Sequence, residues 1–411
     1  IVIGAGPAGM MAAIQAARKG LRVVLLEKNS QPGKKLLLTG NGRCNLCNAE
    51  YNLRQLVENY HNGEFLFRAF SVFGPARTIE FFNNLGISTK TEKDYSGRLK
   101  RVFPARENAA DVIMALKKEL EKNKVKIIFG AEVLKISVKA NKIQKIILAD
   151  KTELIAKNYI FCTGGKSYPL TGSDGSAYNL IEKLGHTIIT LSPALCPLRL
   201  KEEWVKSLQG ITLENIRVNV FQAGGKKAFE DGPIIFTHYG VSGPAILNLS
   251  GFIAELLKNG EVKIGIDLFP KLNQEEVLKG LEEILQKYPR QTVKNVLTEL
   301  APLKFIEVFL QIVKVDPAKI ANNLPKKEKA FLAKNLKNFE ATVEDVYGFD
   351  LAMVTRGGVT LKEIDHKTMR SKIIKNLFFA GEVIDADGKT GGFNLQLCWS
   401  TGFLAGNSVS S

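Results

Sequence analysis

Apolar and polar residues follow a clear order in the first thirty positions of the chain. Residues 1–3 are an apolar run typical of a buried strand, and a glycine-rich turn occupies residues 4–9. Small and apolar residues over 10–19 predict a helix that closes at Gly20, and a second apolar run over 22–26 ends at Glu27. Strand, turn, helix and strand in this order form a βαβ unit, which predicts a parallel sheet.

The central part of the chain returns to the pattern of strands. Residues 51–122 are predicted to be mostly helical, with a basic loop near 95–106. Short apolar runs then predict strands that lead back to the first sheet, at 125–129, 132–138, 142–149, 153–156 and 159–162. A further strand over 375–379 and a final helix over 395–406 complete the predicted α/β fold.

The pattern changes after Pro193, which predicts a second domain. The chain has 411 residues, whereas single cores stop growing at about 250–300 residues. Residues 211–221 and 262–268 alternate as strands do, and residues 274–338 are helical and rich in lysine. We therefore expect an inserted domain over 191–344, with a β part followed by a helical part.

The first glycine turn has the spacing of a dinucleotide-binding loop, Gly4-x-Gly6-x-x-Gly9, and Glu27 lies 23 residues after Gly4. Gly4 permits a tight turn, Gly6 lets the backbone approach a pyrophosphate, and Gly9 lets the helix pack closely on the strand. The N-terminus of the helix offers free N–H groups to a phosphate. Glu27 is placed to accept hydrogen bonds from a ribose.

The loop alone does not distinguish FAD from NAD, but other segments favour FAD. A second glycine- and cation-rich stretch follows the ribose acid, and glycines also follow predicted strands at 163–165 and at 381. Several loops at the carboxyl ends of strands suit a long dinucleotide. We find no second G-x-G-x-x-G, so NAD(P)H is expected only as a transient co-substrate.

Eight segments together resemble a known family: Gly33–Leu36, Gly42–Asn45, Thr163–Pro169, Thr171–Ser173, Phe236–Pro244, Thr355–Val359, Gly381–Glu382 and Thr390–Asn394. They span nearly the whole chain. The chain resembles the bacterial NAD(P)/FAD-dependent oxidoreductases that include the aminoacetone oxidase and BaiN-like enzymes. The resemblance implies a Rossmann-like FAD domain of the glutathione-reductase type over 1–190 and 345–411. It also implies an insert with a β-barrel at about 191–272 and a helical subdomain at about 273–344.

The resemblance also implies where FAD is held. The diphosphate is expected at Gly4, Ala5, Gly6, Pro7, Ala8 and Gly9, the ribose at Glu27 and the adenine beside Val133. The ribityl chain is expected at Gly381 and Glu382, and the isoalloxazine against 42–45, 171–174 and 392–395. The N-terminus of the last helix, near Asn394, is expected to stabilise negative charge on the flavin. The other predicted cofactor residues are Lys28, Lys35, Leu36, Gly42, Arg43, Cys44, Asn45, Thr163, Gly164, Gly165, Gly172, Ser173, Asp174, Gly392, Phe393 and Leu395.

Two positions depart from the family pattern. Asn41 interrupts a run of glycines, although asparagine tolerates left-handed backbone geometry. Cys47 stands where the family commonly has threonine, which creates a C-x-x-C with Cys44. This pair is either a redox-active disulfide or two unlinked thiols beside the flavin. Zinc needs four ligands and there is no second pair, so we expect no metal.

His238 is the single catalytic candidate, as an acid or base or as a contact to substrate; a histidine that merely packs against the backbone is the alternative. Tyr95, Arg98 and residues 101–106 either line a substrate entrance or form a solvated loop. No stretch approaches the apolar length of a membrane span. Five cysteines do not resemble a disulfide framework, so a reducing cytoplasm is expected.

The net charge of +16 permits an anionic partner, but the lysines are spread along the whole chain. Nucleic acid is therefore the less favoured partner. The leading hypothesis is an oxidoreductase that moves a hydride between FAD and a small amine or enone, with O2 or NAD(P)H as the second redox partner. The alternatives are a flavoprotein that modifies tRNA and a flavin-binding protein without catalysis.

Overall fold

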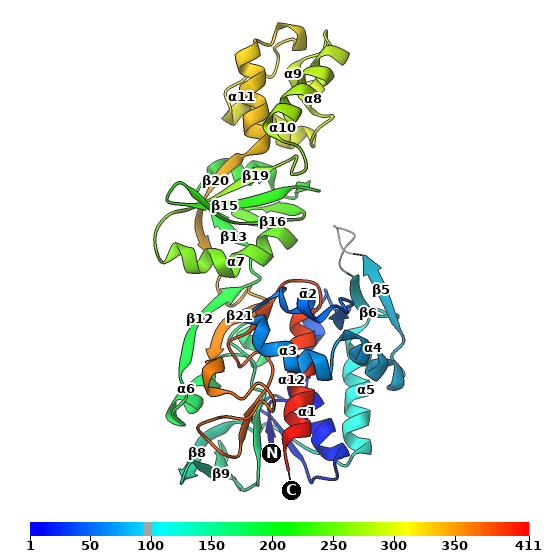
Figure 1. The fold of residues 1–411 in the computed structure, drawn as a ribbon, viewed down its shortest axis with the longest axis vertical. Coiled ribbons are helices and arrows are strands. Elements are labelled where there is room, and N and C mark those ends of the chain that lie inside the picture. Colours follow the sequence, from blue (N-terminus) through cyan, green and yellow to red (C-terminus); the bar gives the residue numbers. More distant parts are fainter. Residues whose placement is uncertain (94–99, 411) are drawn as a thin grey trace. The chain divides into compact units, whose positions relative to one another are not determined.

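The computed structural model describes residues 1–93 and 100–410, and the chain divides into two compact units (Figure 1). One unit comprises Ile1–Ser192 and Phe349–Ser411, and the other comprises Pro193–Gly348. Tyr95 and Arg98, which the sequence suggested for a substrate entrance, lie outside the described residues.

A five-stranded parallel sheet forms the centre of the first unit. Its strand order is β22-β11-β1-β2-β7. Val2 of the middle strand pairs with Leu25 on one side and with Ile160 on the other. The strands are β1 (Val2–Ile3), β2 (Val24–Glu27), β7 (Lys126–Phe129), β11 (Tyr159–Phe161) and β22 (Leu377–Phe379). The middle place of β1 puts the glycine loop that follows it at the centre of one sheet edge.

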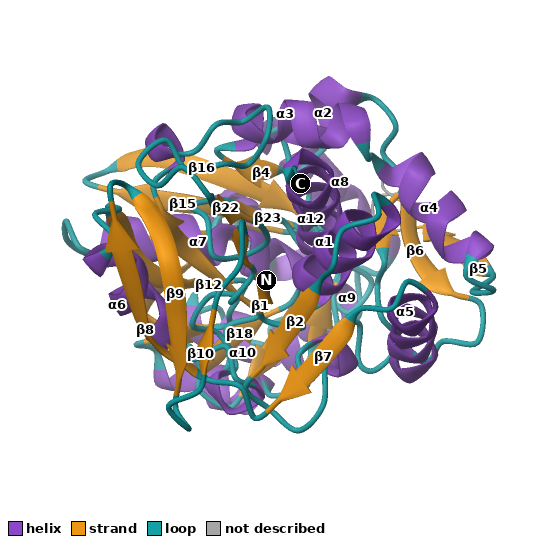
Figure 2. Ribbon diagram, turned by 90° about the horizontal axis from the view of Figure 1, so that it is seen from below, coloured by secondary structure: helices purple, strands orange, loops and turns teal. Residues whose placement is uncertain are grey.

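Two helices from opposite ends of the chain lie side by side in this unit (Figures 1 and 2). They are α1 (Pro7–Arg18) and α12 (Phe393–Ser408). A Cβ at Gly402 would lie 2.4 Å from the backbone oxygen of Ala8, and one at Gly406 would lie 2.4 Å from that of Ala12. Small residues on both helices therefore allow this close approach, and they join the last helix to the first nucleotide-binding element.

Smaller elements surround this core. Residues 51–122 contain more β structure than predicted, because Thr89–Lys93 (β5) pairs with Lys100–Pro104 (β6), which pairs on its other side with Cys47–Asn48 (β3). Val102 and Phe103 of β6 are buried. The remaining elements of the first unit are β3 (Cys47–Asn48), α2 (Leu53–Val57), β4 (Tyr60–His61), α3 (Gly63–Val72), α4 (Pro75–Asn84), β5 (Thr89–Lys93), β6 (Lys100–Pro104), α5 (Ala109–Lys122), β8 (Val133–Lys139), β9 (Lys142–Leu148), β10 (Glu153–Leu154), α6 (Ser176–Lys183), β12 (Ile188–Ala194), β21 (Val354–Val359) and β23 (Asp387–Gly388).

The second unit is built on an antiparallel sheet with the order β14-β17-β18-β13-β20-β19-β15-β16. Within the described ranges no pairing joins β14 to β16, so the strand pairing does not show the closed barrel that the resemblance implies. The elements are β13 (Leu198–Leu200), β14 (Thr212–Leu213), β15 (Arg217–Gln222), β16 (Gly225–Asp231), β17 (Ile234–Thr237), β18 (Gly240–Ser242), α7 (Pro244–Leu257), β19 (Val262–Asp267) and β20 (Phe339–Val346).

Four helices follow β19: α8 (Gln274–Lys287), α9 (Val293–Leu297), α10 (Leu303–Ile312) and α11 (Lys326–Lys337). The predicted helical segment of about 273–344 is too long at its end, because residues from Phe339 onward form β20. Ile266 pairs with Phe339 and Val262 with Val343. The partner strand lies far away in the sequence, so local periodicity did not reveal this strand.

Candidate functional site

Four loops meet at one edge of the parallel sheet. Gly4 follows β1, Glu27 ends β2, the loop of Thr163 follows β11, and the loop of Gly381 follows β22. The carboxyl ends of parallel strands point the same way, so segments from both ends of the chain converge here.

These loops line a cavity that encloses about 1110 Å³ of space, including the solvent at its open mouth. The cavity gathers 17 of the predicted cofactor residues: Gly4, Gly6, Pro7, Ala8, Glu27, Lys28, Lys35, Leu36, Val133, Thr163, Gly164, Gly165, Gly172, Ser173, Asp174, Gly381 and Glu382.

The three glycines of the first loop have different surroundings. Gly4 has a φ of 98°, and a Cβ there would lie 2.5 Å from the backbone oxygen of Cys162. A Cβ at Gly9 would lie 1.8 Å from the oxygen of Gly4. At Gly6 a Cβ would meet nothing within 4 Å, and α1 begins directly after it without a side-chain cap. The fold therefore requires Gly4 and Gly9, whereas Gly6 keeps open the space in front of the helix N-terminus.

Glu27 stabilises the glycine loop through hydrogen bonds, in addition to its predicted role as an acceptor for the ribose. Its Oε2 accepts a hydrogen bond from the backbone N–H of Ala5 at 2.9 Å. Its Oε1 accepts from the backbone and the side chain of Asn29, at 2.9 and 2.8 Å. A carboxylate has about four acceptor positions, and one is left for a ribose hydroxyl. Asn29, which the sequence did not single out, also donates to the backbone oxygen of Thr171 at 3.1 Å.

Two polar atoms in the cavity have no partner. The hydroxyl oxygens of Thr163 and Ser173 are buried and make no hydrogen bond within the described part of the chain. Both residues line the cavity. Buried polar groups are nearly always hydrogen-bonded in native proteins, so these atoms indicate a polar ligand. Together with the open approach at Gly6, they show that the residues present fit a dinucleotide.

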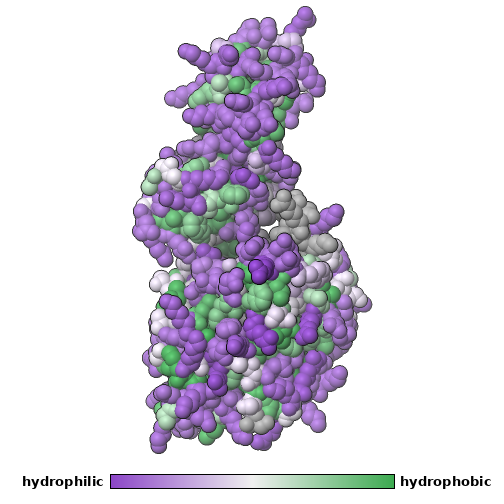
Figure 3. All heavy atoms as spheres, in the orientation of Figure 1, coloured by the Kyte–Doolittle hydropathy of each residue, from purple (hydrophilic) through white to green (hydrophobic). Residues whose placement is uncertain are grey.

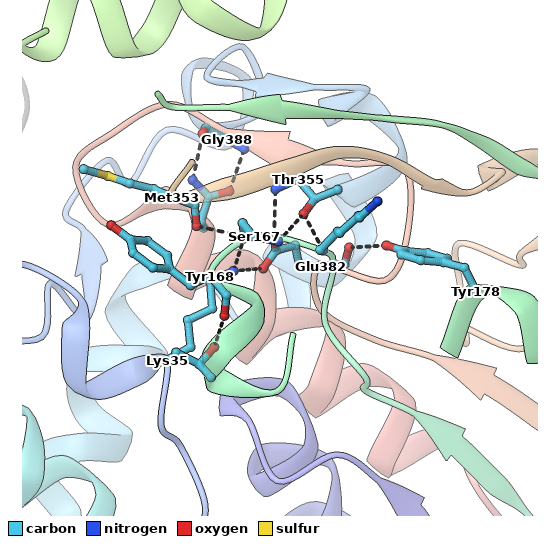
Figure 4. Close-up of polar contacts among 11 residues, drawn as sticks. Lys35, Ser167, Tyr168, Tyr178, Met353, Thr355, Glu382 and Gly388 are labelled. Atoms are coloured by element: carbon cyan, nitrogen blue, oxygen red, sulfur yellow. Dashed lines mark hydrogen bonds and ion pairs between the residues drawn. The ribbon is translucent and has the colours of Figure 1, made fainter. Parts of the chain in front are cut away.

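A partly buried ion pair joins the basic loop to the last glycine loop (Figure 4). Lys35 Nζ donates to Glu382 Oε2 at 2.8 Å and also to the hydroxyl of Ser167. Glu382 Oε1 accepts from the hydroxyl of Ser167 at 2.9 Å and from the backbone N–H of Thr355 at 2.8 Å. Thr355 Oγ1 accepts in turn from the backbone N–H groups of Lys166 and Ser167. Ser167 and Thr355 both lie in segments that carry the family resemblance, but neither was assigned a role from the sequence, because their contacts to Glu382 join residues far apart in the chain.

The other predicted cofactor residues do not line this cavity. Ala5 and Gly9 lie within the loop and the start of α1, and the segments 42–45 and 392–395 come together elsewhere in the unit. With its amide oriented to satisfy both ends, Asn45 accepts from the backbone N–H of Gly392 at 3.0 Å and donates to the backbone oxygen of Cys47 at 3.1 Å. The placement of the isoalloxazine at Gly42, Arg43, Cys44, Asn45, Gly392, Phe393, Asn394 and Leu395 stays a prediction.

Several side chains in these two segments already have partners in the protein. Arg43 lies over the ring of Phe103, with its Cζ 4.1 Å from the centroid, and it pairs with Glu92 and Glu107 at 3.1 Å. The amide of Asn394 exchanges two hydrogen bonds with the backbone of Gly388, at 2.7 and 2.8 Å. The charge of Arg43 is therefore matched by carboxylates in the protein, and Asn394 fixes the loop before α12.

Cys44 and Cys47 are buried free thiols. Burial raises the pKa of the Cys44 thiol to about 12 from its usual 9.0, and burial also raises the pKa of Cys47. The folded protein thus holds these protons more tightly than the unfolded chain. The stability linked to them is present below the usual thiol pKa and is lost as the pH rises toward about 12. Free, buried thiols with raised pKa values favour the interpretation as two unlinked cysteines.

Alkylation tests this interpretation. Iodoacetamide at about pH 8 should label neither Cys44 nor Cys47 in the folded protein, because only the thiolate reacts. Both should be labelled after unfolding in guanidinium, and the mass map should be the same with and without reductant. A Cys44–Cys47 disulfide in the unreduced sample would contradict the expectation.

His238 belongs to the second unit and does not line the cavity. It is exposed in the turn between β17 and β18, and its Nδ1 lies 3.2 Å from Gln209 Oε1. Its catalytic role stays a prediction. Residues 1–93 and 100–410 contain no group of three His, Cys, Asp or Glu side chains arranged to hold a metal. Over the same ranges, no helix has the length and apolar character needed to cross a membrane.

A parallel sheet with this glycine loop, an acid at the end of the second strand and a long cavity at the strand ends define a Rossmann-type dinucleotide-binding protein. Solved flavoenzymes share this fold. The 3-ketosteroid-Δ4-(5α)-dehydrogenase of Rhodococcus jostii matches with a TM-score of 0.51 and 16% identity, over 98% of this chain and 96% of that one. The 3-ketosteroid Δ1-dehydrogenase of Sterolibacterium denitrificans matches with a TM-score of 0.52 and 12% identity, over 99% and 98%.

The family profile described as HI0933-like protein Rossmann domain matches residues 1–408. The chain therefore belongs to this family of FAD-binding oxidoreductases, which confirms the resemblance seen in the sequence. The 3-dehydro-bile acid delta(4,6)-reductase of Clostridium scindens is 35% identical over 100% of this chain and 98% of its own length. The ribosomal RNA dihydrouridine synthases of Haemophilus influenzae and Escherichia coli are 32% and 28% identical, over 100% of this chain and 98% and 97% of their lengths.

Proposed function

We propose that this protein is an FAD-dependent reductase that adds a hydride to a carbon–carbon double bond conjugated with a carbonyl group. The observation that carries the proposal is the cavity at the strand ends, with its open approach at Gly6 and its unpartnered hydroxyls of Thr163 and Ser173. The names of the relatives indicate which class of reaction to propose. A keto-steroid enone and a uracil ring both present a double bond that is polarised by a carbonyl, and reduced flavin supplies hydride to such a bond.

The chain's own residues supply binding and orientation. In this proposal the diphosphate lies against the N-terminus of α1 beside Gly6, and Glu27 accepts from the ribose. The ion pair between Lys35 and Glu382 keeps the basic loop and the last glycine loop at a constant distance from each other. The binding site for FAD is therefore formed before the cofactor binds. The isoalloxazine is placed at 42–45 and 392–395, as the resemblance implies, and His238 remains the candidate proton donor.

NAD(P)H is the proposed reductant of the flavin. Only one G-x-G-x-x-G occurs in the sequence, so the nicotinamide would dock transiently rather than in a domain of its own. An oxidase that takes a hydride from an amine and passes electrons to O2 is the alternative. Free thiols at all five cysteines suit the reducing cytoplasm that we propose as the compartment.

An anaerobic spectral titration tests the proposed reaction. We expect NADPH or NADH to bleach the visible bands of the bound flavin, and a 4-en-3-one steroid or uridine to restore them without air. Reduction by an amine, with recovery only after oxygen is admitted, would favour the oxidase. A flavin that none of these compounds reduces would favour a non-catalytic flavoprotein, and a colourless protein would contradict FAD binding itself.

RNA is a second candidate for the molecule that carries the double bond. Two relatives are named for a reaction on ribosomal RNA, and the net charge of this chain is +16. A strongly positive protein attracts phosphates over a long range. These two observations make nucleic acid a stronger candidate partner than the even spread of lysines along the chain suggests by itself.

A further inference from the structure

Helix α11 of the second unit has one buried face and one exposed, basic face. Leu332, Ala333 and Leu336 are buried in the core of this unit. Lys327, Phe331 and Lys334 are exposed and are spaced four and three residues apart, so they share the opposite face. The part of the molecule that contains α8–α11, at the top of Figure 3, has a mostly hydrophilic surface broken by small apolar patches.

The segment 303–337, which contains α10 and α11, carries more positive than negative charge. Residues 303–337 contain eight lysines and three acids. Two of the acids are already engaged, Glu307 with Lys294 at 3.3 Å and Glu328 with Lys319 at 2.8 Å. Among the described residues, no ion pair joins the following lysines to an acid: Lys304, Lys314, Lys326, Lys327, Lys329 and Lys334.

This arrangement works against the stability of α11. Lys326 and Lys327 stand in the first turn, where the helix dipole disfavours a cation by about 0.3–1 kcal/mol. Lys334 and Lys337 stand in the last turn, where the dipole favours cations, and Lys337 pairs with Asp267 at 2.7 Å. The dipole therefore accounts for the lysines at the C-terminal end of α11, whereas Lys326 and Lys327 are unfavourable for the helix and suit a polyanionic partner.

Phe331 adds an aromatic surface to the charge. Its side chain is 46% exposed, and no ring or cation lies over it in the part of the chain that the structure describes. Phe229 is similarly exposed, at 50%, but it is covered by Arg217 at 4.3 Å and by Lys226 at 4.6 Å. An uncovered ring between lysines is the combination that binds single-stranded nucleic acid, through stacking on a base and contacts to phosphates.

We propose that the exposed face of α11, formed by Lys326, Lys327, Phe331 and Lys334, docks single-stranded RNA. The lysines contact phosphates and Phe331 stacks on a base. The inference rests on the proposed function and narrows it, because the conjugated double bond then belongs to a nucleobase. An anionic membrane is the less suitable partner, since an interfacial helix needs a wide apolar face and this face has one large apolar side chain.

Fluorescence anisotropy of the full-length, FAD-loaded protein with a labelled 20-nucleotide oligouridylate tests the proposal. Binding should weaken as salt rises, with a slope of about −2 for three phosphate contacts. K327E/K334E should weaken binding at least tenfold and flatten this slope. Phe331→Ala should weaken binding by about 5- to 150-fold with the slope unchanged, and Phe331→Tyr should restore it.

Matched controls separate a docking face from general charge. K139E/K142E makes the same change of charge on the exposed tip of β8 and β9, and Phe229→Ala removes the covered aromatic ring; both should bind RNA as the wild type does. The proposal would be overturned if K139E/K142E weakened RNA binding as much as K327E/K334E does, or if the wild type did not bind the oligonucleotide at low salt. It would also be overturned if K327E/K334E lost binding to phosphatidylserine vesicles but kept binding to RNA. Reoxidation of the reduced flavin by free uridine, which carries the nucleobase but no phosphate chain to dock, should be unchanged in K327E/K334E, so a failure of docking is distinguishable from a failure of the proposed chemistry.

Discussion

Gly6→Val is expected to give a folded protein that no longer binds FAD. Gly6 has a φ of −78°, which any L-residue adopts, and a Cβ there meets nothing within 4 Å. The apoprotein therefore tolerates the side chain. The added methyl groups occupy the space in front of the α1 N–H groups, where we place the diphosphate. Loss of two charge-assisted hydrogen bonds predicts an affinity for FAD at least about 100-fold weaker.

The measurement is titration of the apoprotein with FAD, followed by flavin fluorescence, together with circular dichroism to show that Gly6→Val is folded. Gly280→Ala is the matched control, because Gly280 also has open space around it but lies in α8 of the other unit. It should bind FAD normally and gain about 0.5–1 kcal/mol in stability. Normal flavin content in Gly6→Val would show that the diphosphate does not lie against this loop. Gly9→Val should fail differently, by preventing folding, because the Gly4 oxygen occupies its position.

Lys35→Met is expected to lower the free energy of unfolding of the FAD-free protein by about 2–3 kcal/mol. Lys35 and Glu382 have side chains that are 23% and 16% exposed, so the carboxylate left behind is poorly hydrated. Removing one partner of a fully buried pair costs about 3–5 kcal/mol, and the partial exposure reduces this figure. The Ser167 hydroxyl and the Thr355 N–H still contact Glu382, but they do not cancel its charge.

Urea denaturation measures this effect. In a Trp204→Phe background the single remaining tryptophan is Trp399, which is buried in the first unit and reports on its unfolding. Lys28→Met is the control, because the pair of Lys28 and Asp174 is more exposed, at 26% and 43%, and should contribute under about 1 kcal/mol. The double variant K35M/E382Q should lose less than the sum of its single variants. Equal losses of unfolding free energy in Lys35→Met and Lys28→Met would show that the Lys35–Glu382 pair stabilises the protein no more than the exposed pair does.

The sequence predicted the site best where a feature depends on neighbours in the chain. The turn at Gly4, the helix that follows it and the strand ending at Glu27 all arise from short-range rules of backbone geometry and periodicity. The loops at Thr163 and Gly381 were also found, because glycines directly follow apolar runs. These signals were sufficient to place both loops at the sheet edge that carries Glu27.

Prediction was weaker where a residue's role depends on a distant partner. Arg43 was predicted beside the isoalloxazine, and its ion pairs with Glu92 and Glu107 were not anticipated. Ser167 and Thr355 lie in recognised segments but had no predicted role, although both position Glu382. The helical pattern ended at 338, but the implied helical subdomain was extended to about 344; strand β20 begins at Phe339, and its partner β19 lies far away in the sequence.

The sequence by itself therefore determined that this protein binds a dinucleotide. The close approach of a backbone to a pyrophosphate needs glycines at one fixed spacing, and that spacing is visible in nine residues. Only the tertiary structure decided which groups surround the cavity. Lys35 meets Glu382 across 347 positions of the chain, because the strand order β22-β11-β1-β2 brings both ends of the chain to one sheet edge. Strand order depends on the packing of the whole domain, and no local pattern encodes it.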